Sequence, residues 1–210
     1  MRWRFTLIGV AAAVLAAAPA WAQAPNLAPK DTPKNWVEPP ASLPRAEKGD
    51  PTRNLDFLFE ALKIAPDDTT AKAIEQRIWA LWFVSKSDTA NLLMTRVRAA
   101  VEAKDLDLAL KLLNSLIKIR PDYVEAWNRR ATIYFMKNEY GRAIADIREV
   151  LKREPRHFGA LSGLGFILQE MDDNKHALEV FRRAVDVYPR IERIPDLVKT
   201  LREKVEGRDI

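Results

Sequence analysis

The sequence contains no cysteine, which excludes disulfides, thiolate nucleophiles, iron–sulfur clusters and thiolate zinc sites. It also excludes a lipidated N-terminal cysteine. Glycine is scarce, with 7 in 210 residues, and eight of the 13 prolines lie between Pro19 and Pro51. Because both residue types interrupt helices, their scarcity after residue 51 favours helical structure in the rest of the chain.

A large excess of one sign of charge is also lacking, since the formal net charge is +5. Arg2 and Arg4 lie in a segment that we expect to be removed, which lowers the excess by two. A bias this weak is typical of solvated helix faces and does not indicate a groove for nucleic acid. We therefore expect no nucleic-acid partner.

The first 22 residues have the pattern of a secretory signal peptide. Two arginines precede an apolar stretch from Phe5 to Ala18, and the small residues Ala20 and Ala22 follow. The pattern predicts cleavage after Ala22 and, in a bacterial host, a periplasmic protein. The alternative is an uncleaved anchor, although a membrane span takes about 20 apolar residues and this run is shorter. No second run of that length follows, so we expect no membrane span after cleavage.

Composition divides the remaining chain into four parts. Residues 23–50 are rich in proline, alanine and charge, and they contain too few large apolar groups to offset their ordering entropy, which predicts a disordered leader. Residues 51–86 contain two apolar stripes at helical spacing and predict an irregular helical hairpin. Residues 87–190 contain a repeat, and residues 191–210 predict a capping helix and a tail.

Equivalent residues recur every 34 positions in this repeat region. The recurring sets are Pro121, Pro155 and Pro189, then Ala109, Ala143 and Ala177, then Leu113, Ile147 and Phe181. Each unit has two stretches of helical periodicity, separated by a short polar turn. One such unit cannot bury its own apolar face, so the units must stack on one another.

The residue pattern of these units resembles the tetratricopeptide repeat. The middle unit carries Trp127, Ala131, Tyr134, Ala143, Ile147, Val150 and Pro155 at the characteristic positions. The resemblance covers about residues 90–190 and implies an all-α fold, a solenoid of stacked antiparallel helix pairs that forms a superhelix. Arg96 and Arg130 depart from the pattern, because the family prefers leucine at their position.

Catalytic and metal-binding motifs are absent from the sequence. The two histidines, His157 and His176, belong to no zinc-binding pattern, and no nucleophile elbow, dinucleotide fingerprint or phosphate-binding loop occurs. Gly159, Gly163 and Gly165 lie on or at the start of a predicted helix, so they do not form a phosphate cradle. We expect no enzyme activity, no cofactor and no metal.

The family resemblance implies that the first helix of each unit lines a concave face that binds a protein or peptide. The outward residues of these helices are then the predicted contacts: Asn91, Met94, Arg98, Glu125, Asn128, Thr132, Phe135, Ser162, Phe166 and Gln169. Phe135 and Phe166 could instead be buried against neighbouring helices. Trp79 and Trp82 could form a ligand platform, or they could pack on the first helix and cover the apolar end of the array.

These features favour a periplasmic scaffold that holds another polypeptide, with a role in assembly or maintenance of the cell envelope. Two alternatives stay open. The chain could self-associate into a structural homo-oligomer through the N-terminal hairpin and its Trp79 and Trp82 pair, or through the C-terminal cap. It could also be an accessory subunit of an envelope enzyme, or a hydrolase whose site has no recognised motif.

Overall fold

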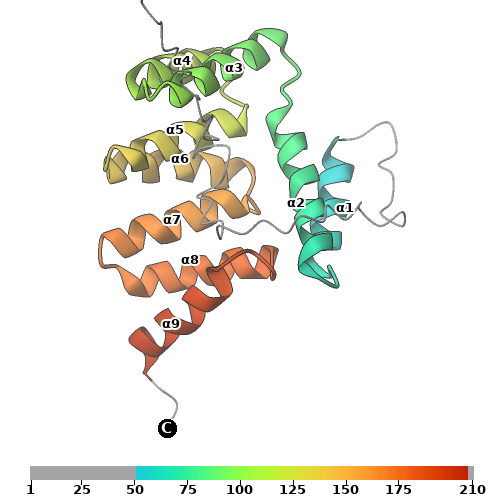
Figure 1. The fold of residues 1–210 in the computed structure, drawn as a ribbon, viewed down its shortest axis with the longest axis vertical. Helices are drawn as coiled ribbons and strands as arrows, with labels where there is room; N and C mark the ends of the chain where they lie inside the picture. Colours follow the sequence, from blue (N-terminus) through green and yellow to red (C-terminus); the bar gives the residue numbers. More distant parts are fainter. Residues whose placement is uncertain (1–50, 208–210) are drawn as a thin grey trace, which may run out of the picture.

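The computed structural model describes residues 51–207, and these residues form nine helices without any strand (Figure 1). The expected signal peptide and leader lie outside the described residues. The all-α fold class predicted from the sequence is confirmed. The helices are α1 (Pro51–Lys63), α2 (Asp68–Phe83), α3 (Asp88–Glu102), α4 (Leu106–Ile119), α5 (Val124–Met136), α6 (Tyr140–Arg153), α7 (Phe158–Glu170), α8 (Asn174–Val187) and α9 (Ile194–Glu206).

Helices α3 to α8 form three antiparallel pairs that stack in chain order (Figure 1). Within each pair the turn contains one residue in the left-handed region, at Lys104, Asn138 and Asp172, each with φ of 59°. The next residue donates its N–H to a carbonyl of the preceding helix, as Asp105 does to Ala100 at 2.8 Å. This is the Schellman arrangement, which satisfies the last carbonyls of the helix and reverses the chain in few residues.

Small residues allow the two helices of a pair to approach closely. Ala109, Ala143 and Ala177 are fully buried at the crossing points. Gly165 of α7 lies against the ring of Phe181 of α8, and a Cβ atom at this position would overlap that ring. These alanines and this glycine therefore set the helix spacing at which the apolar faces close.

Arg130, which departs from the expected leucine, joins three helices. Its guanidinium forms two hydrogen bonds of 2.7 Å to the buried carboxylate of Asp146 on α6, and a third of 2.7 Å to Asn114 on α4. Its charge also lies over the Trp127 ring, 5.0 Å from the ring centroid. The departure therefore replaces an apolar contact by a polar bridge between neighbouring repeats.

The array ends with α9, which packs on α8 through the buried side chains of Ile194 and Leu201. At the surface, the Arg182 guanidinium donates two hydrogen bonds to the Glu206 carboxylate and so joins the two helices. The residues on the outer side of α9 are charged, so the last helix covers the apolar face of α8 and presents a polar surface.

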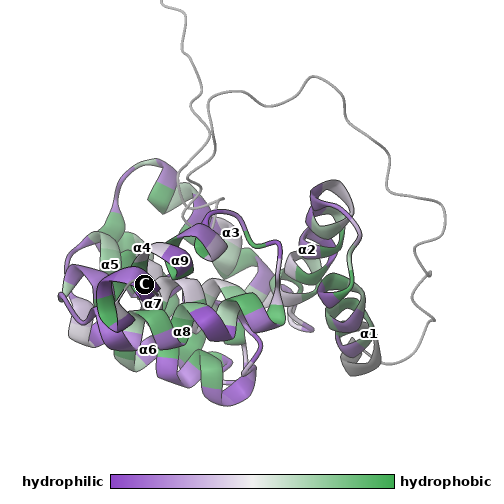
Figure 2. Ribbon diagram, turned by 90° about the horizontal axis from the view of Figure 1, so that it is seen from below, coloured by the Kyte–Doolittle hydropathy of each residue, from purple (hydrophilic) through white to green (hydrophobic). Residues whose placement is uncertain are grey.

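Helices α1 and α2 form a separate antiparallel hairpin beside the array (Figures 1 and 2). Apolar residues of both helices form the core of the hairpin, which includes Leu62, Ile74 and Ile78. α2 contacts α5, and α1 contacts α8, so the hairpin lies across the stack and does not extend it as another layer. Its contacts place it over the N-terminal ends of α5 and α7.

Candidate functional site

The predicted contact residues lie along α3, α5 and α7, but their exposure differs from helix to helix. Along α5 and α7 three of them are buried, namely Glu125, Asn128 and Ser162. The others are at least partly accessible: Asn91, Met94, Thr132, Phe135, Phe166 and Gln169 are half-buried, and Arg98 is exposed. The accessible part of the predicted face is therefore the α3 end and the C-terminal halves of α5 and α7.

The first turns of α5 and α7 contain a buried polar cluster. The Glu125 carboxylate is fully buried and lies 2.7 Å from the Nε atom of Arg129, while Asn128 donates its amide N–H to both carboxylate oxygens at 3.2 Å. His157 is also fully buried, and its Nε2 lies 3.4 Å from Glu125. His157 Nδ1 accepts the backbone N–H of Ala160 at 3.0 Å, which caps α7. A neutral imidazole in this arrangement carries its proton on Nε2, directed to the carboxylate.

The charge state of this cluster follows from its surroundings. Burial alone would raise the pKa of the Glu125 carboxyl, but the Arg129 charge and the hydrogen bonds from His157 and Asn128 together lower it below its ordinary value of 4.5. The buried carboxylate is therefore ionised at neutral pH and paired with a buried guanidinium. No sequence pattern indicates this cluster, because each of its residues also fits an ordinary surface position of the repeat.

Two tryptophans of α2 cover the histidine. The Trp82 ring stacks on His157 with centroids 4.0 Å apart and planes 7° apart, and the Trp79 ring meets His157 edge-on at 5.5 Å. Both indoles also contact Phe158. Trp82 packs on Phe59 of α1 as well. Trp82 therefore packs on α1, as one of the two interpretations held, and both tryptophans join the hairpin to the third repeat.

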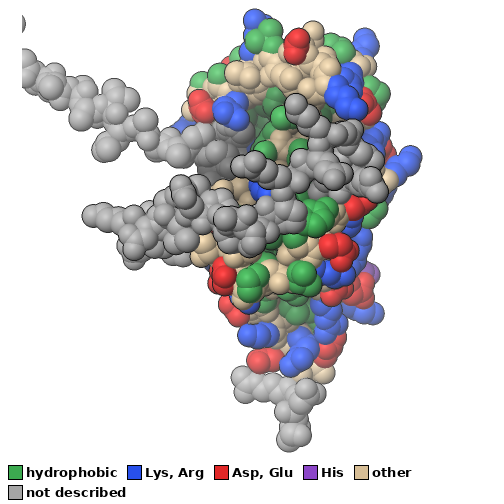
Figure 3. Space-filling view, turned by 90° about the vertical axis from the view of Figure 1, so that its right-hand side faces the viewer, with side chains coloured by type: hydrophobic (Ala, Val, Ile, Leu, Met, Phe, Trp, Pro, Cys, Tyr) green, Lys and Arg blue, Asp and Glu red, His purple; other side chains and the backbone are tan. Residues whose placement is uncertain are grey.

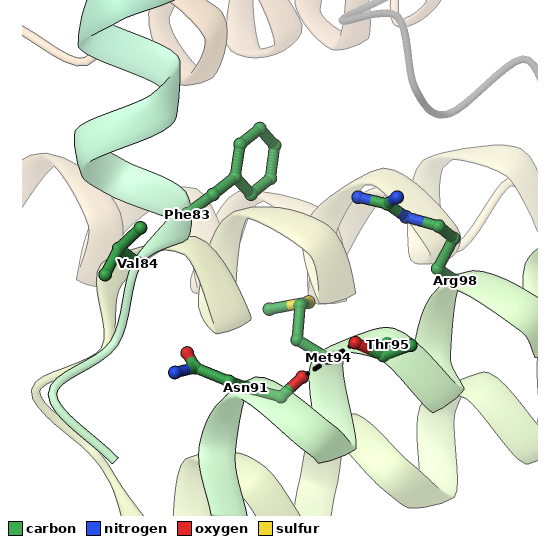
Figure 4. Close-up of a pocket in the computed structure, with 6 residues that line it drawn as sticks. All are labelled: Phe83, Val84, Asn91, Met94, Thr95 and Arg98. Carbon is green, nitrogen blue, oxygen red and sulfur yellow. Dashed lines mark hydrogen bonds between the residues drawn. The ribbon is translucent and has the colours of Figure 1, made fainter. Parts of the chain in front are cut away.

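An open pocket of about 190 Å³ lies where α2 passes α3, lined by Phe83, Val84, Asn91, Met94, Thr95 and Arg98. Figure 4 shows Phe83 at the end of α2 facing α3, with Met94 and Arg98 directed toward it. Three of the predicted contacts, on α3, thus share one cavity. Its wall combines a phenyl ring and a thioether with a guanidinium, which suits a side chain that is apolar along its length and polar or acidic at its tip.

Asn91 has a structural role in this pocket. Its amide accepts the backbone N–H of Ser85 at 3.0 Å and donates to the Ser85 carbonyl at 3.1 Å. These paired bonds hold the linker between α2 and α3 against the start of α3. Asn91 therefore shapes the pocket by holding this linker in place.

Phe135 and Phe166 are neither fully exposed nor fully buried. Each ring packs on the second helix of its own repeat, Phe135 on Tyr140 at 5.9 Å and Phe166 on Phe181 at 5.3 Å. Part of each ring stays accessible, so both remain predicted contacts with a reduced available area.

The described residues contain no group of three His, Asp or Glu side chains that could hold a metal ion. His176, the second histidine, is exposed beside Asp173, the residue that caps α8. Among residues 51–207 no helix combines the length and the apolar character needed to cross a membrane. On the face seen in Figure 3, basic and acidic side chains are interspersed.

Comparison with known proteins identifies the family. The family model described as tetratricopeptide repeat matches residues 94–156. A TPR repeat-containing protein of Rhizobium etli is 40% identical over 163 residues, which is 78% of this chain and 80% of that protein. This chain belongs to the tetratricopeptide-repeat family.

More distant members show the same fold. The small glutamine-rich tetratricopeptide repeat-containing protein 2 of Saccharomyces cerevisiae is 24% identical over 145 residues, covering 69% of this chain and 36% of that protein. The solved Sgt2 TPR domain from Aspergillus fumigatus covers 57% of this chain and 81% of its own, with a TM-score of 0.51 and 21% identity. The first TPR of Spaghetti (RPAP3), solved with the HSP90 peptide SRMEEVD, has a TM-score of 0.54, 15% identity, and coverage of 58% and 96%.

Proposed function

We propose that this tetratricopeptide-repeat protein is a scaffold that binds a protein or peptide at the α3 pocket and along the accessible part of α5 and α7. The observation that carries the proposal is the pocket itself, in which Met94 and Arg98 of α3, together with Phe83 of α2, present apolar and cationic groups. α3 is the first helix of the first repeat, and the family resemblance implies that such helices line the binding face. A structural neighbour supports it, since the first TPR of Spaghetti (RPAP3) was solved with a bound HSP90 peptide.

The test compares the partners captured by three forms of the full-length protein: wild type, a pocket variant with Met94→Lys and Arg98→Glu, and a control with Lys111→Glu on the exposed side of α4. We expect one or more polypeptides to be captured by the wild type and the control, and to be lost from the pocket variant. Capture of the same set by all three forms would reject the pocket as the site.

The periplasmic location and the envelope role belong to the same proposal. They are supported by the signal-peptide pattern of residues 1–22, which precedes the helical region. N-terminal sequencing of the protein from a fractionated bacterial host provides the test. A periplasmic form that begins at Gln23 is expected, and a cytoplasmic form that begins at Met1 would overturn this part of the proposal.

Self-association is the second candidate function. Phe57 of α1 and Ile64, which directly follows the last residue of α1, are 44% and 80% exposed, so both present apolar surface on the hairpin. Light scattering over a hundredfold range of concentration tests this candidate. A constant monomer mass would remove it, and a mass that rises with concentration and reverts on Phe57→Ser and Ile64→Ser would support it.

A further inference from the structure

The hairpin and the array have separate hydrophobic cores. The core of the hairpin consists of α1 and α2 residues, to which the array adds Phe158 and Tyr188 as its buried members. Three further clusters of buried residues hold α3 to α9 together, and their members all come from those helices. Helices α3 to α9 therefore have core clusters of their own, and the hairpin packs on the array where it covers Phe158 and Tyr188.

In the hydrogen bonds between the two parts, the array donates and the hairpin accepts. Arg190, which follows α8, donates to the carbonyl oxygens of Ala65 at 3.0 Å and Pro66 at 2.6 Å, and to the Asp68 carboxylate at 2.8 Å. Its guanidinium thus lies at the C-terminal end of α1, where unpaired carbonyls and the helix dipole favour a cation.

In three more hydrogen bonds a residue of the array donates to the hairpin. Arg156 donates to Asp56 at 2.7 Å, Tyr123 donates to the carbonyl of Phe83 at 2.7 Å, and Tyr188 donates to Glu75 at 3.2 Å. Burial and the neighbouring Glu75 raise the pKa of Tyr188, so its phenol stays protonated as a donor. In each of these hydrogen bonds the array supplies the donor, and the hairpin supplies a carboxylate or a backbone carbonyl.

An aromatic slot lies between these donors. It is formed by His157, Phe158 and Gly159, and Trp79 and Trp82 fill it from one face of α2. A Cβ atom added to Gly159 would lie 2.8 Å from the Trp79 ring, so the slot needs glycine at this position. The surface therefore selects a helix with two aromatic residues three positions apart and acidic groups beside them.

We infer that this surface is a binding site for an acidic helical segment with an aromatic pair, and that the α1–α2 hairpin occupies it as an intramolecular competitor. The inference rests on the proposed function and names the chemistry of a second partner surface. The exposed ion pairs Arg190–Asp68 and Arg156–Asp56 hold the hairpin weakly, since such pairs contribute about 0–1 kcal/mol. The packing of the aromatic pair on His157 and Phe158 is therefore a larger part of the attachment than these two ion pairs.

The test uses the full chain and a labelled synthetic peptide of residues 51–84 as the probe. In the release variant, Trp79→Ala and Trp82→Ala weaken the resident hairpin but leave the array unchanged. The tethered hairpin competes with the peptide at an effective concentration on the order of millimolar. Weakening the hairpin therefore makes the site available to the peptide. We expect fluorescence anisotropy to give at least tenfold tighter peptide binding to the release variant than to the wild type.

Matched substitutions locate the site. Adding Gly159→Ala to the release variant should weaken peptide binding at least tenfold, because the new methyl group enters the slot. Adding Gly163→Ala, in the same helix, should change it less than twofold, since its Cβ would meet Ile147 at an ordinary 3.9 Å. On the peptide, Glu75→Gln should weaken binding and Glu60→Gln, at an exposed position, should not.

Absence of peptide binding to a release variant that keeps its helical circular dichroism would overturn the inference. If the release variant loses its helical signal, Trp79→Ala alone provides a milder release of the aromatic attachment, and equal peptide binding to it and to the wild type would also overturn the inference. The capture experiment at Met94 and Arg98 concerns the other end of the layer, so its outcome tests the proposed function separately.

Discussion

Replacement of Glu125 by glutamine tests whether the buried ion pair at the start of α5 stabilises the fold. The carboxylate is fully buried and lies 2.7 Å from the Nε atom of Arg129, a residue that is itself only 7% exposed. The carboxylate also contacts His157 and Asn128. Glutamine has nearly the same shape but no charge. Removal of one partner of a buried ion pair costs about 3–5 kcal/mol, and we expect about 3 kcal/mol because the amide oxygen can still accept a hydrogen bond.

Urea unfolding followed by circular dichroism at pH 7 measures this loss. Glu149→Gln is the matched control, because Glu149 makes the same chemical type of pair with Arg153 on the accessible side of α6. We expect the control to unfold at nearly the wild-type urea concentration. A loss for Glu125→Gln that is no larger than the loss for the control would refute the reasoning.

The same substitution should change how stability depends on pH. In the folded protein the pKa of Glu125 is below its ordinary value of 4.5, so the unfolded chain takes up the proton more readily. The stabilisation from this carboxylate is then fully present above about pH 4.5 and is lost as the pH falls through the folded-state value. The difference in free energy of unfolding between wild type and variant should therefore shrink as the pH is lowered from 7 toward 3.

Two further substitutions test the packing of the array. Arg130→Ala leaves the buried Asp146 carboxylate without its guanidinium partner and should lower the free energy of unfolding by about 3 kcal/mol, as measured by urea titration. Gly165→Ala places a methyl group against the Phe181 ring and should destabilise by about 1–3 kcal/mol in a thermal melt, whereas Gly141→Ala, where a Cβ meets no atom within 4 Å, should not destabilise. Equal melting of the two glycine variants would contradict the role assigned to Gly165.

The repeat could be predicted from the sequence because its signals are local and recur. The alanines at the helix crossings and the prolines after the second helices have the same 34-residue spacing, and each set marks the same point in every unit. The fold class follows from them, and the structure confirms it. The accessibility of Met94 and Arg98 agrees with the family resemblance, which assigns both residues to the outward side of a first helix.

The position of the hairpin could not be predicted in this way. Tyr188 and Glu75 are 113 residues apart in sequence, and Arg190 and Ala65 are 125 apart, and no periodic pattern links them. The burial of Glu125 depends on the same long-range contacts, because His157, its partner, lies under Trp82. The family resemblance places Glu125 on the predicted binding face, and no local pattern indicates the partners that bury it.

The way in which the hairpin crosses the stack has a consequence for how the chain comes apart. A row of repeats usually frays from either end, because each unit contacts only its neighbours. Here α1 contacts α8 and α2 contacts α5, so the first two helices act as a clasp on the second and third repeats, which are far from them in sequence. While the clasp is closed, loosening of α8 also strains the opposite end, and unfolding should approach a single cooperative step. Once a ligand opens it, the two ends become free to fray independently.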